Sequence, residues 1–149
     1  WRNYSGGANY VWFMGMTMGN PVVTGGASLP GVSSSDWWID ASGDMNGDGH
    51  PDILWRNYDT GANYVWFLDM TMGNPVVTGG AGLPAQPNVD WVIEGLSDMN
   101  GDGAPDILWR NYLSGANYLW YMGSTMGSPV VTGGASLPTV PDWNWETGE

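Results

Sequence analysis

WRNY, at residues 55–58, is a tetrapeptide that this chain also contains at residues 1–4 and 109–112. Both offsets are 54 residues, and 38 of the 54 positions are identical between residues 1–54 and 55–108. Chance does not produce that agreement. The 24 glycines and 10 prolines leave no room for helices of ordinary length. A period of about 50 residues without helices predicts the blades of a β-propeller.

The repeats organise the chain as one array, residues 1–149, with units at 1–54, 55–108 and 109–149. We expect the third unit to be incomplete, because it stops before its own copy of the acidic loop that the other two contain. The chain begins at Trp1 rather than at Met and shows no signal peptide. We therefore expect a processed chain or an excerpt of a longer one.

Four short strands are predicted in each unit, joined by tight turns. In the second unit they cover residues 52–58, 63–68, 75–78 and 90–94, where Trp, Tyr, Val and Ile gather between glycines and prolines. Four antiparallel strands per unit match one propeller blade. The predicted fold class is therefore all-β, with four-stranded antiparallel blades. The array is expected to be open, or completed by other copies or further repeats.

The charge of the chain is one-sided, with 15 acidic residues against 3 basic ones and a net charge of −12 at pH 7. Such a surface repels phosphate backbones, so nucleic acid and anionic membranes are not expected partners. No apolar run approaches the roughly 18 residues that a membrane-spanning helix needs, so membrane insertion is not expected. Cysteine is absent, which excludes disulfides and thiolate metal sites. A divalent cation is the partner that this charge favours.

Two nine-residue loops, 44–52 and 98–106, have the composition of a calcium site. Hard cations such as Ca²⁺ take six to eight oxygen ligands. Side-chain oxygens stand at positions 1, 3, 5 and 9 of each loop, and a backbone carbonyl is available at position 7. The expected ligands are Asp44, Asn46, Asp48, the carbonyl of His50 and Asp52, and in the second loop Asp98, Asn100, Asp102, the carbonyl of Ala104 and Asp106.

Asp, Asn and Gly also form turns readily, so a metal-free turn is the alternative interpretation of these loops. Both copies keep every oxygen-bearing position, although His50 is replaced by Ala104 within the same loops. Closely spaced carboxylates also repel one another unless a cation neutralises them. These two arguments favour the calcium site. The EF-hand is excluded, because position 12 would need a Glu and holds Trp55 or Trp109.

The run DxNGDGxPDILWRN, followed by a TGxxxxVW-like strand, resembles the FG-GAP/VCBS-type repeats of bacterial surface and secreted proteins. These repeats are relatives of the integrin α-subunit propeller repeats. The resemblance covers essentially the whole chain. It implies a β-propeller, calcium held at the rim by the side chains of the two loops, and an extracellular or cell-surface location. Closed propellers have about four to eight blades, and this chain supplies fewer than three complete units.

The three arginines, Arg2, Arg56 and Arg110, occupy the same repeat position. They could form a ring of guanidinium groups that binds anions or sugars. Alternatively, each could be a structural partner of a nearby carboxylate, such as Asp52 or Asp106. We favour the second interpretation, because an arginine within a strand of a stacked blade is expected to be paired.

Tryptophans that recur in every unit are expected in the core between blades, although Trp and Tyr can also stack on sugars. The recurring residues are Trp12, Trp66 and Trp120, and Trp37, Trp91 and Trp143. Trp38 and Trp145 break the repeat and are therefore the candidates for exposed glycan contacts. Asn3 begins an N-x-S sequence that the other copies lack, which makes it a candidate for glycosylation.

Catalysis is not expected. Without cysteine, and with His50 as the only histidine inside a metal loop, no Ser-His-Asp or Cys-His arrangement can form. The prediction is a non-catalytic, extracellular, calcium-stabilised repeat module for adhesion or self-assembly into a ring or filament. Its expected partners are other copies of itself or further repeats of the same polypeptide. The alternatives are a carbohydrate-binding propeller lectin and an accessory propeller of a larger secreted enzyme.

Overall fold

The computed structural model describes residues 1–140, which form ten β-strands and no helix. The all-β prediction is therefore confirmed for this part of the chain. No helix long and apolar enough to cross a membrane is found in it. The strands are β1 (Asn9–Thr17), β2 (Asn20–Leu29), β3 (Trp37–Gly43), β4 (Asp52–Asn57), β5 (Asn63–Thr71), β6 (Asn74–Leu83), β7 (Trp91–Ser97), β8 (Asp106–Asn111), β9 (Asn117–Thr125) and β10 (Ser128–Leu137).

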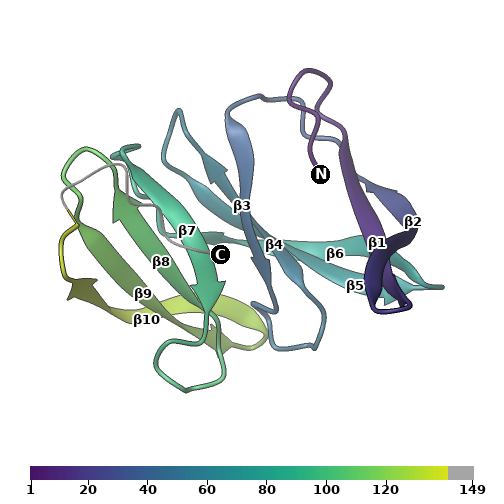
Figure 1. The fold of residues 1–149 in the computed structure, drawn as a ribbon. Helices are drawn as coiled ribbons and strands as arrows, with labels where there is room; N and C mark the ends of the chain where they lie inside the picture. Colours follow the sequence, from purple (N-terminus) through teal and green to yellow (C-terminus); the bar gives the residue numbers. More distant parts are fainter. Residues whose placement is uncertain (141–149) are drawn as a thin grey trace.

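The strands form three antiparallel sheets, which follow one another across the molecule (Figure 1). The first sheet pairs β1 with β2, the second has the order β3-β4-β5-β6, and the third has the order β7-β8-β9-β10. At one edge β3 lies against β7, and at the opposite edge β6 lies against both β2 and β10. Like edges therefore meet like edges, as in propeller blades, and the sheets of the described residues do not close into a ring.

The blades are out of phase with the sequence repeat. Residues 90–94, predicted as the last strand of the second blade, fall in β7, which belongs to the next sheet. The predicted strand is therefore present, but its assignment to the second blade was wrong. The physical reason is that each acidic loop closes a hairpin: Gly43 at the end of β3 pairs with Asp52 at the start of β4, and Ser97 at the end of β7 pairs with Asp106 at the start of β8. A strand before such a hairpin must join the sheet of the strand that follows it.

The core lies between the sheets. Leu29 of the first sheet packs with Ile53 and Leu68 of the second, and a larger cluster joins the second sheet to the third through residues such as Leu54 and Ile107. Every residue of β4 is buried, because sheets cover both of its faces. Each blade is therefore stabilised by its neighbours more than by any core of its own.

Three hairpin tips carry a methionine in an unusual conformation. Met18, Met72 and Met126 have φ of 51°, 52° and 53°, and each is followed by a glycine that also has positive φ. This is the type I′ turn, which favours Asn-Gly. All three methionine side chains are essentially fully exposed. A methionine in the left-handed region is strained, so these turns sacrifice some stability.

Asparagine at these three tips is expected to stabilise the protein. The triple variant Met18→Asn, Met72→Asn, Met126→Asn should raise the free energy of unfolding by up to about 1 kcal/mol per turn, because asparagine tolerates positive φ. Urea denaturation measures the change. Met70→Asn is the matched control, since Met70 is an exposed strand residue, where asparagine should bring no gain. A triple variant no more stable than the parent would contradict the explanation.

Candidate functional site

Each acidic loop closes a hairpin within one blade, between β3 and β4 or between β7 and β8. In the first loop, the carboxylate of Asp44 accepts hydrogen bonds from the backbone amides of Gly47 (2.8 Å), Asp48 (3.1 Å) and Gly49 (2.9 Å). The φ values of Gly47 and Gly49 are 82° and 90°, a conformation that glycine adopts readily. The loop thus wraps its own backbone around its first carboxylate.

Asp48, at the fifth position of the loop, is exposed, and Asn46, at the third position, lies half-buried beside it. Asn46 Nδ2 donates to Asp48 Oδ2 at 2.8 Å, and the amide of His50 donates to Asp48 Oδ1 at 2.8 Å. The latter bond is the main reason why the pKa of Asp48 lies below its usual value, so this carboxylate is ionised at neutral pH. The second loop repeats the pattern: the amide of Ala104 lowers the pKa of Asp102 in the same way.

The ninth position differs from the others because it is buried. Asp52 is 0% exposed, and its two oxygens accept from the amides of Met45 (2.9 Å), Asn46 (3.2 Å) and Leu68 (3.0 Å). Burial raises the pKa of Asp52, and the hydrogen bonds from the Leu68 and Met45 amides act in the opposite direction. This carboxylate ties the loop to β5, a role that the sequence did not reveal.

The second loop has the same tie. Asp106 is also 0% exposed, and it accepts from the amides of Met99 (3.1 Å) and Met122 on β9 (3.0 Å). Thus both loops are anchored to the neighbouring strand of their own sheet. The repetition of the contact shows that it belongs to the fold and not to one copy.

The chemistry of the donor set suits calcium, because every predicted ligand is an oxygen and several are charged. The structure does not bring the predicted side chains together as a metal cage, however. Among the described residues, no three Asp, Glu or His side chains form a group that could hold an ion. The carboxylates instead accept hydrogen bonds from loop amides. Calcium binding by the two loops therefore stays a prediction.

Arg2 and Arg56 are structural, but the predicted pairing of Arg56 with Asp52 was wrong. Arg56 is 0% exposed and donates to Asn63 Oδ1 (3.1 Å) and to the carbonyls of Gln86 (3.0 Å) and Asn88 (3.4 Å). Asp52, the expected partner, already has both oxygens occupied by backbone amides. In the first sheet, Arg2 reaches the equivalent carbonyls, those of Val32 and Ser34.

Each of the first two arginines also stacks on a tryptophan of the following blade. The guanidinium carbon of Arg2 lies 5.1 Å from the ring centroid of Trp55, and that of Arg56 lies 4.9 Å from the ring of Trp109. Both tryptophans are almost completely buried. Cation–π contacts of this kind between desolvated groups are worth about 2 kcal/mol. This contact between blades could have been found in the sequence. Trp and Arg are adjacent in each repeat and so point to opposite faces of one strand, where they face different neighbouring blades.

The other recurring tryptophans are partly buried against the core where a blade covers them. Trp66 and Trp120 pack on it, as do Trp37 and Trp91, in agreement with the core interpretation. Trp12, at the same repeat position as Trp66, is instead 47% exposed. Trp143 lies outside the described residues.

The candidate glycan contacts are only partly described by the structure. Trp38 is 45% exposed and stacks against Tyr4, with a centroid distance of 4.3 Å. Trp145 lies outside the described residues. Asn3 Oδ1 accepts from the amides of Ser5 and Gly6, so the side chain shapes its own turn. Glycan binding and glycosylation of Asn3 both stay predictions.

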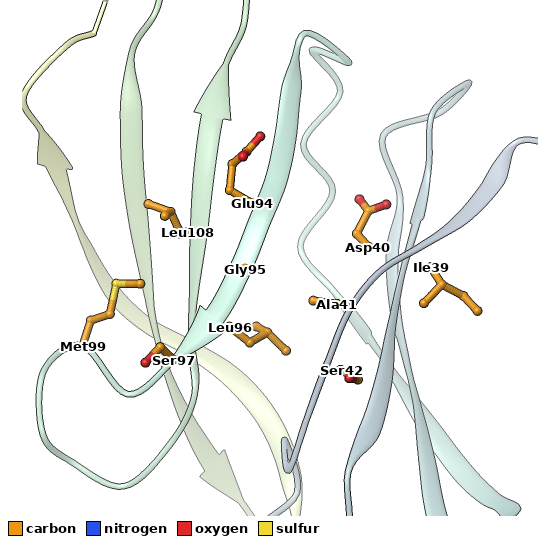
Figure 2. Close-up of a pocket in the computed structure, with 10 residues that line it drawn as sticks. All are labelled: Ile39, Asp40, Ala41, Ser42, Glu94, Gly95, Leu96, Ser97, Met99 and Leu108. Carbon is orange, nitrogen blue, oxygen red and sulfur yellow. The ribbon is translucent and has the colours of Figure 1, made fainter. Parts of the chain in front are cut away.

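A cavity of about 520 Å³ between β3 and β7 holds a carboxyl group that the sequence analysis overlooked. Figure 2 shows Asp40 and Glu94 on its two facing strands. Tyr58 Oη donates to Asp40 Oδ2 at 2.8 Å. Burial raises the pKa of Asp40 to about 7, whereas the Tyr58 hydrogen bond and the charge of Arg56 oppose this and the charge of Glu94 adds to it.

Stability is therefore expected to depend on pH through Asp40. The folded state holds a proton on Asp40 up to about pH 7, whereas the unfolded carboxyl releases it near its ordinary pKa of 3.8. The stabilisation is thus complete below about pH 4 and is lost as the pH rises through about 7. Asp40→Asn keeps an oxygen that can accept from Tyr58 but removes the titrating group. The melting temperature of this variant should therefore depend less on pH between pH 5 and 8. The pH-dependent change in the free energy of unfolding that disappears is roughly 1–2 kcal/mol after solvent screening.

Thermal melts at several pH values test this, with the exposed Asp59→Asn as the control for a simple change in net charge. If Asp40→Asn and Asp59→Asn have the same effect on the slope, Asp40 is not the titrating group.

Comparison with known families agrees with this architecture. The family model of the FG-GAP repeat matches residues 37–68, which run from β3 through the first acidic loop and β4 into β5. Neither curated proteins nor solved structures gave a match to this chain. The matched segment lies within one sheet and includes its loop. Residues 37–68 of this all-β, blade-forming chain are therefore similar to an FG-GAP repeat.

Proposed function

We propose that this chain is a non-catalytic, extracellular module, stabilised by calcium, that acts by adhesion or self-assembly. The observation that carries the proposal is the placement of the core between blades, with Arg2 and Arg56 each stacked on the next blade. Repeat proteins of this kind gain their stability from nearest-neighbour interfaces, so a blade without a neighbour leaves apolar surface uncovered. Further blades of the same kind are the natural partner for that surface.

Calcium fits the two acidic loops by ligand chemistry. Asp44, Asn46 and Asp48 would supply side-chain oxygens in the first loop, and Asp98, Asn100 and Asp102 would do so in the second. Bound there, the ion would neutralise the clustered carboxylates of a chain whose net charge is −12. The extracellular location agrees with this, because outside the cell calcium is abundant enough to fill even weak sites of about 10⁻³ M.

Calcium is expected to raise the melting temperature, because a ligand that binds only the folded state stabilises it by mass action. At a concentration 100 times the dissociation constant, the gain is about 2.7 kcal/mol per site. The double variant Asp48→Asn, Asp102→Asn keeps one oxygen to accept from the amide of His50 or Ala104 but removes two charges, and should lose most of this gain. The exposed Asp90→Asn controls for net charge. An identical melting curve in calcium and in excess chelator would refute the proposal for the loops.

A further inference from the structure

The two acidic loops differ in how far a neighbouring blade covers them. Met45 and Met99 stand at the second position of the first and the second loop, and they are 4% and 43% exposed. The residues on either side of Met45 are half-buried, whereas those on either side of Met99 are exposed. The loops differ in sequence at one position only, and their backbones agree, since φ is 82° at Gly47 and 81° at Gly101. The difference in exposure therefore arises from what lies over each loop.

The third sheet supplies the cover of the first loop. Met45 belongs to the core cluster that joins the second sheet to the third, together with Ile107 of β8. Gly43, at the base of the loop, also approaches the third sheet closely: a Cβ atom at this position would lie 3.4 Å from Leu96 Cδ1 and 3.9 Å from Pro105 Cβ. Among the described residues no sheet lies beyond the third (Figure 1), so the second loop has no such cover.

The buried methionine of the first loop stands among its expected calcium ligands. Met45 separates Asp44 from Asn46, which are the ligands expected at positions 1 and 3. Its own amide donates to Oδ2 of Asp52, at position 9, over 2.9 Å. The packing of Met45 therefore restrains the backbone next to three expected ligands. In the second loop Met99 is exposed, so no contact with a further blade restrains the same stretch of backbone.

We propose that Met45 is a positioning residue that couples the first acidic loop to the third blade. This proposal rests on the calcium binding proposed above. Because its backbone is ordered before the ion arrives, the first loop should bind Ca²⁺ about 5- to 30-fold more tightly than the second, which must order at least one more residue on binding. The coupling is reciprocal, so calcium in the first loop should favour the packing of the third sheet on Met45 by the same factor.

Calorimetric titration with Ca²⁺ measures the affinity of each loop separately. Both loops line one cavity of about 340 Å³, so the charge of an ion in one loop would affect the other. Each loop is therefore titrated with the other disabled: Asp102→Asn leaves the first loop intact, and Asp48→Asn leaves the second. Each variant loses one charge, and neither changes Met45. At one protein concentration, the Asp102→Asn variant is expected to bind Ca²⁺ more tightly than the Asp48→Asn variant.

The methionines are then exchanged within these two variants. Met45→Ala, added to Asp102→Asn, should lower the affinity for Ca²⁺ to about that of the second loop. Met45→Leu, which nearly conserves the volume of the side chain, should retain the tighter binding. Met99→Ala, added to Asp48→Asn, is the matched control and should leave the affinity unchanged, because Met99 is exposed. Circular dichroism checks that the variants fold. Comparison within one loop removes the influence of the single sequence difference between the loops.

The outcomes separate this coupling from calcium binding itself. A tighter first loop whose advantage is lost in Met45→Ala and kept in Met45→Leu would support the coupling. A first loop that binds no more tightly than the second, or a folded Met45→Ala variant with unchanged affinity, would overturn the coupling and leave calcium binding in place. No binding by either loop would overturn both proposals. If Met45→Ala does not fold, the comparison of Asp102→Asn with Asp48→Asn still decides, because it leaves Met45 intact.

Discussion

Asp52→Asn is expected to lower the free energy of unfolding by roughly 2–4 kcal/mol. The carboxylate is fully buried and accepts hydrogen bonds from three backbone amides. Two of them, those of Met45 and Asn46, belong to its own loop, and the third is that of Leu68 on β5. Asparagine offers only one oxygen, and its amide group would meet amide donors. At least one buried donor would then lose its partner, which costs about 1–3 kcal/mol, in addition to the loss of charge-assisted bonds.

Urea denaturation in excess chelator measures this effect without any contribution from bound metal. Asp48→Asn is the matched control, because it makes the same substitution in the same loop at an exposed position where the acceptor is kept. We expect it to change stability by less than about 0.5 kcal/mol. Equal effects of the two substitutions would show that Asp52 does not tie the loop to β5.

Arg56→Leu is expected to lower the free energy of unfolding by roughly 3–5 kcal/mol. The substitution removes the cation–π contact with Trp109, and it leaves Asn63 Oδ1 and the carbonyls of Gln86 and Asn88 without their buried donor. Unlike Asp52, Arg56 connects two blades. Its loss should therefore weaken the cooperativity between the second and third sheets as well as overall stability.

Arg2→Leu is the control for Arg56→Leu, because Arg2 has the same stacking geometry on Trp55 but is only half-buried. Its cost should be clearly smaller, since solvent can reach the groups that lose their partner. Both variants are compared by urea denaturation at one protein concentration, because assembly would couple stability to concentration. A larger loss for Arg2→Leu would contradict the role given to burial.

Much of the fold could be predicted because the repeat is nearly exact. The period, the strand-forming segments and the acidic loops are all visible in the sequence. The boundary between one blade and the next is not visible, because a repeat has no intrinsic beginning. Residues 90–94 could be the last strand of one sheet or the first strand of the next. The loop at 98–106 decides, since a hairpin forces pairing between the strands that it joins.

The side-chain partners were harder to predict than the strands. Pairing Arg56 with Asp52 was reasonable by charge, but amides contributed by β5 and by the loop had already satisfied that carboxylate. Asp40 was overlooked for a similar reason, because its burial comes from the packing of β3 against β7. In both cases the deciding contacts arise from tertiary structure, which a single repeat does not encode locally.

The stacking of Arg2 and Arg56 on the next blade has an evolutionary consequence. Because both junctions among the described residues use the same pair of faces, unequal crossover between copies of the gene segment can add or remove 54 residues at any point of the period. The protein encoded by the recombined gene still consists of whole blades. An arginine of one blade still lies opposite a tryptophan of the next, so no new type of contact is needed. Blade number can then drift by recombination alone, while selection acts on which totals can close.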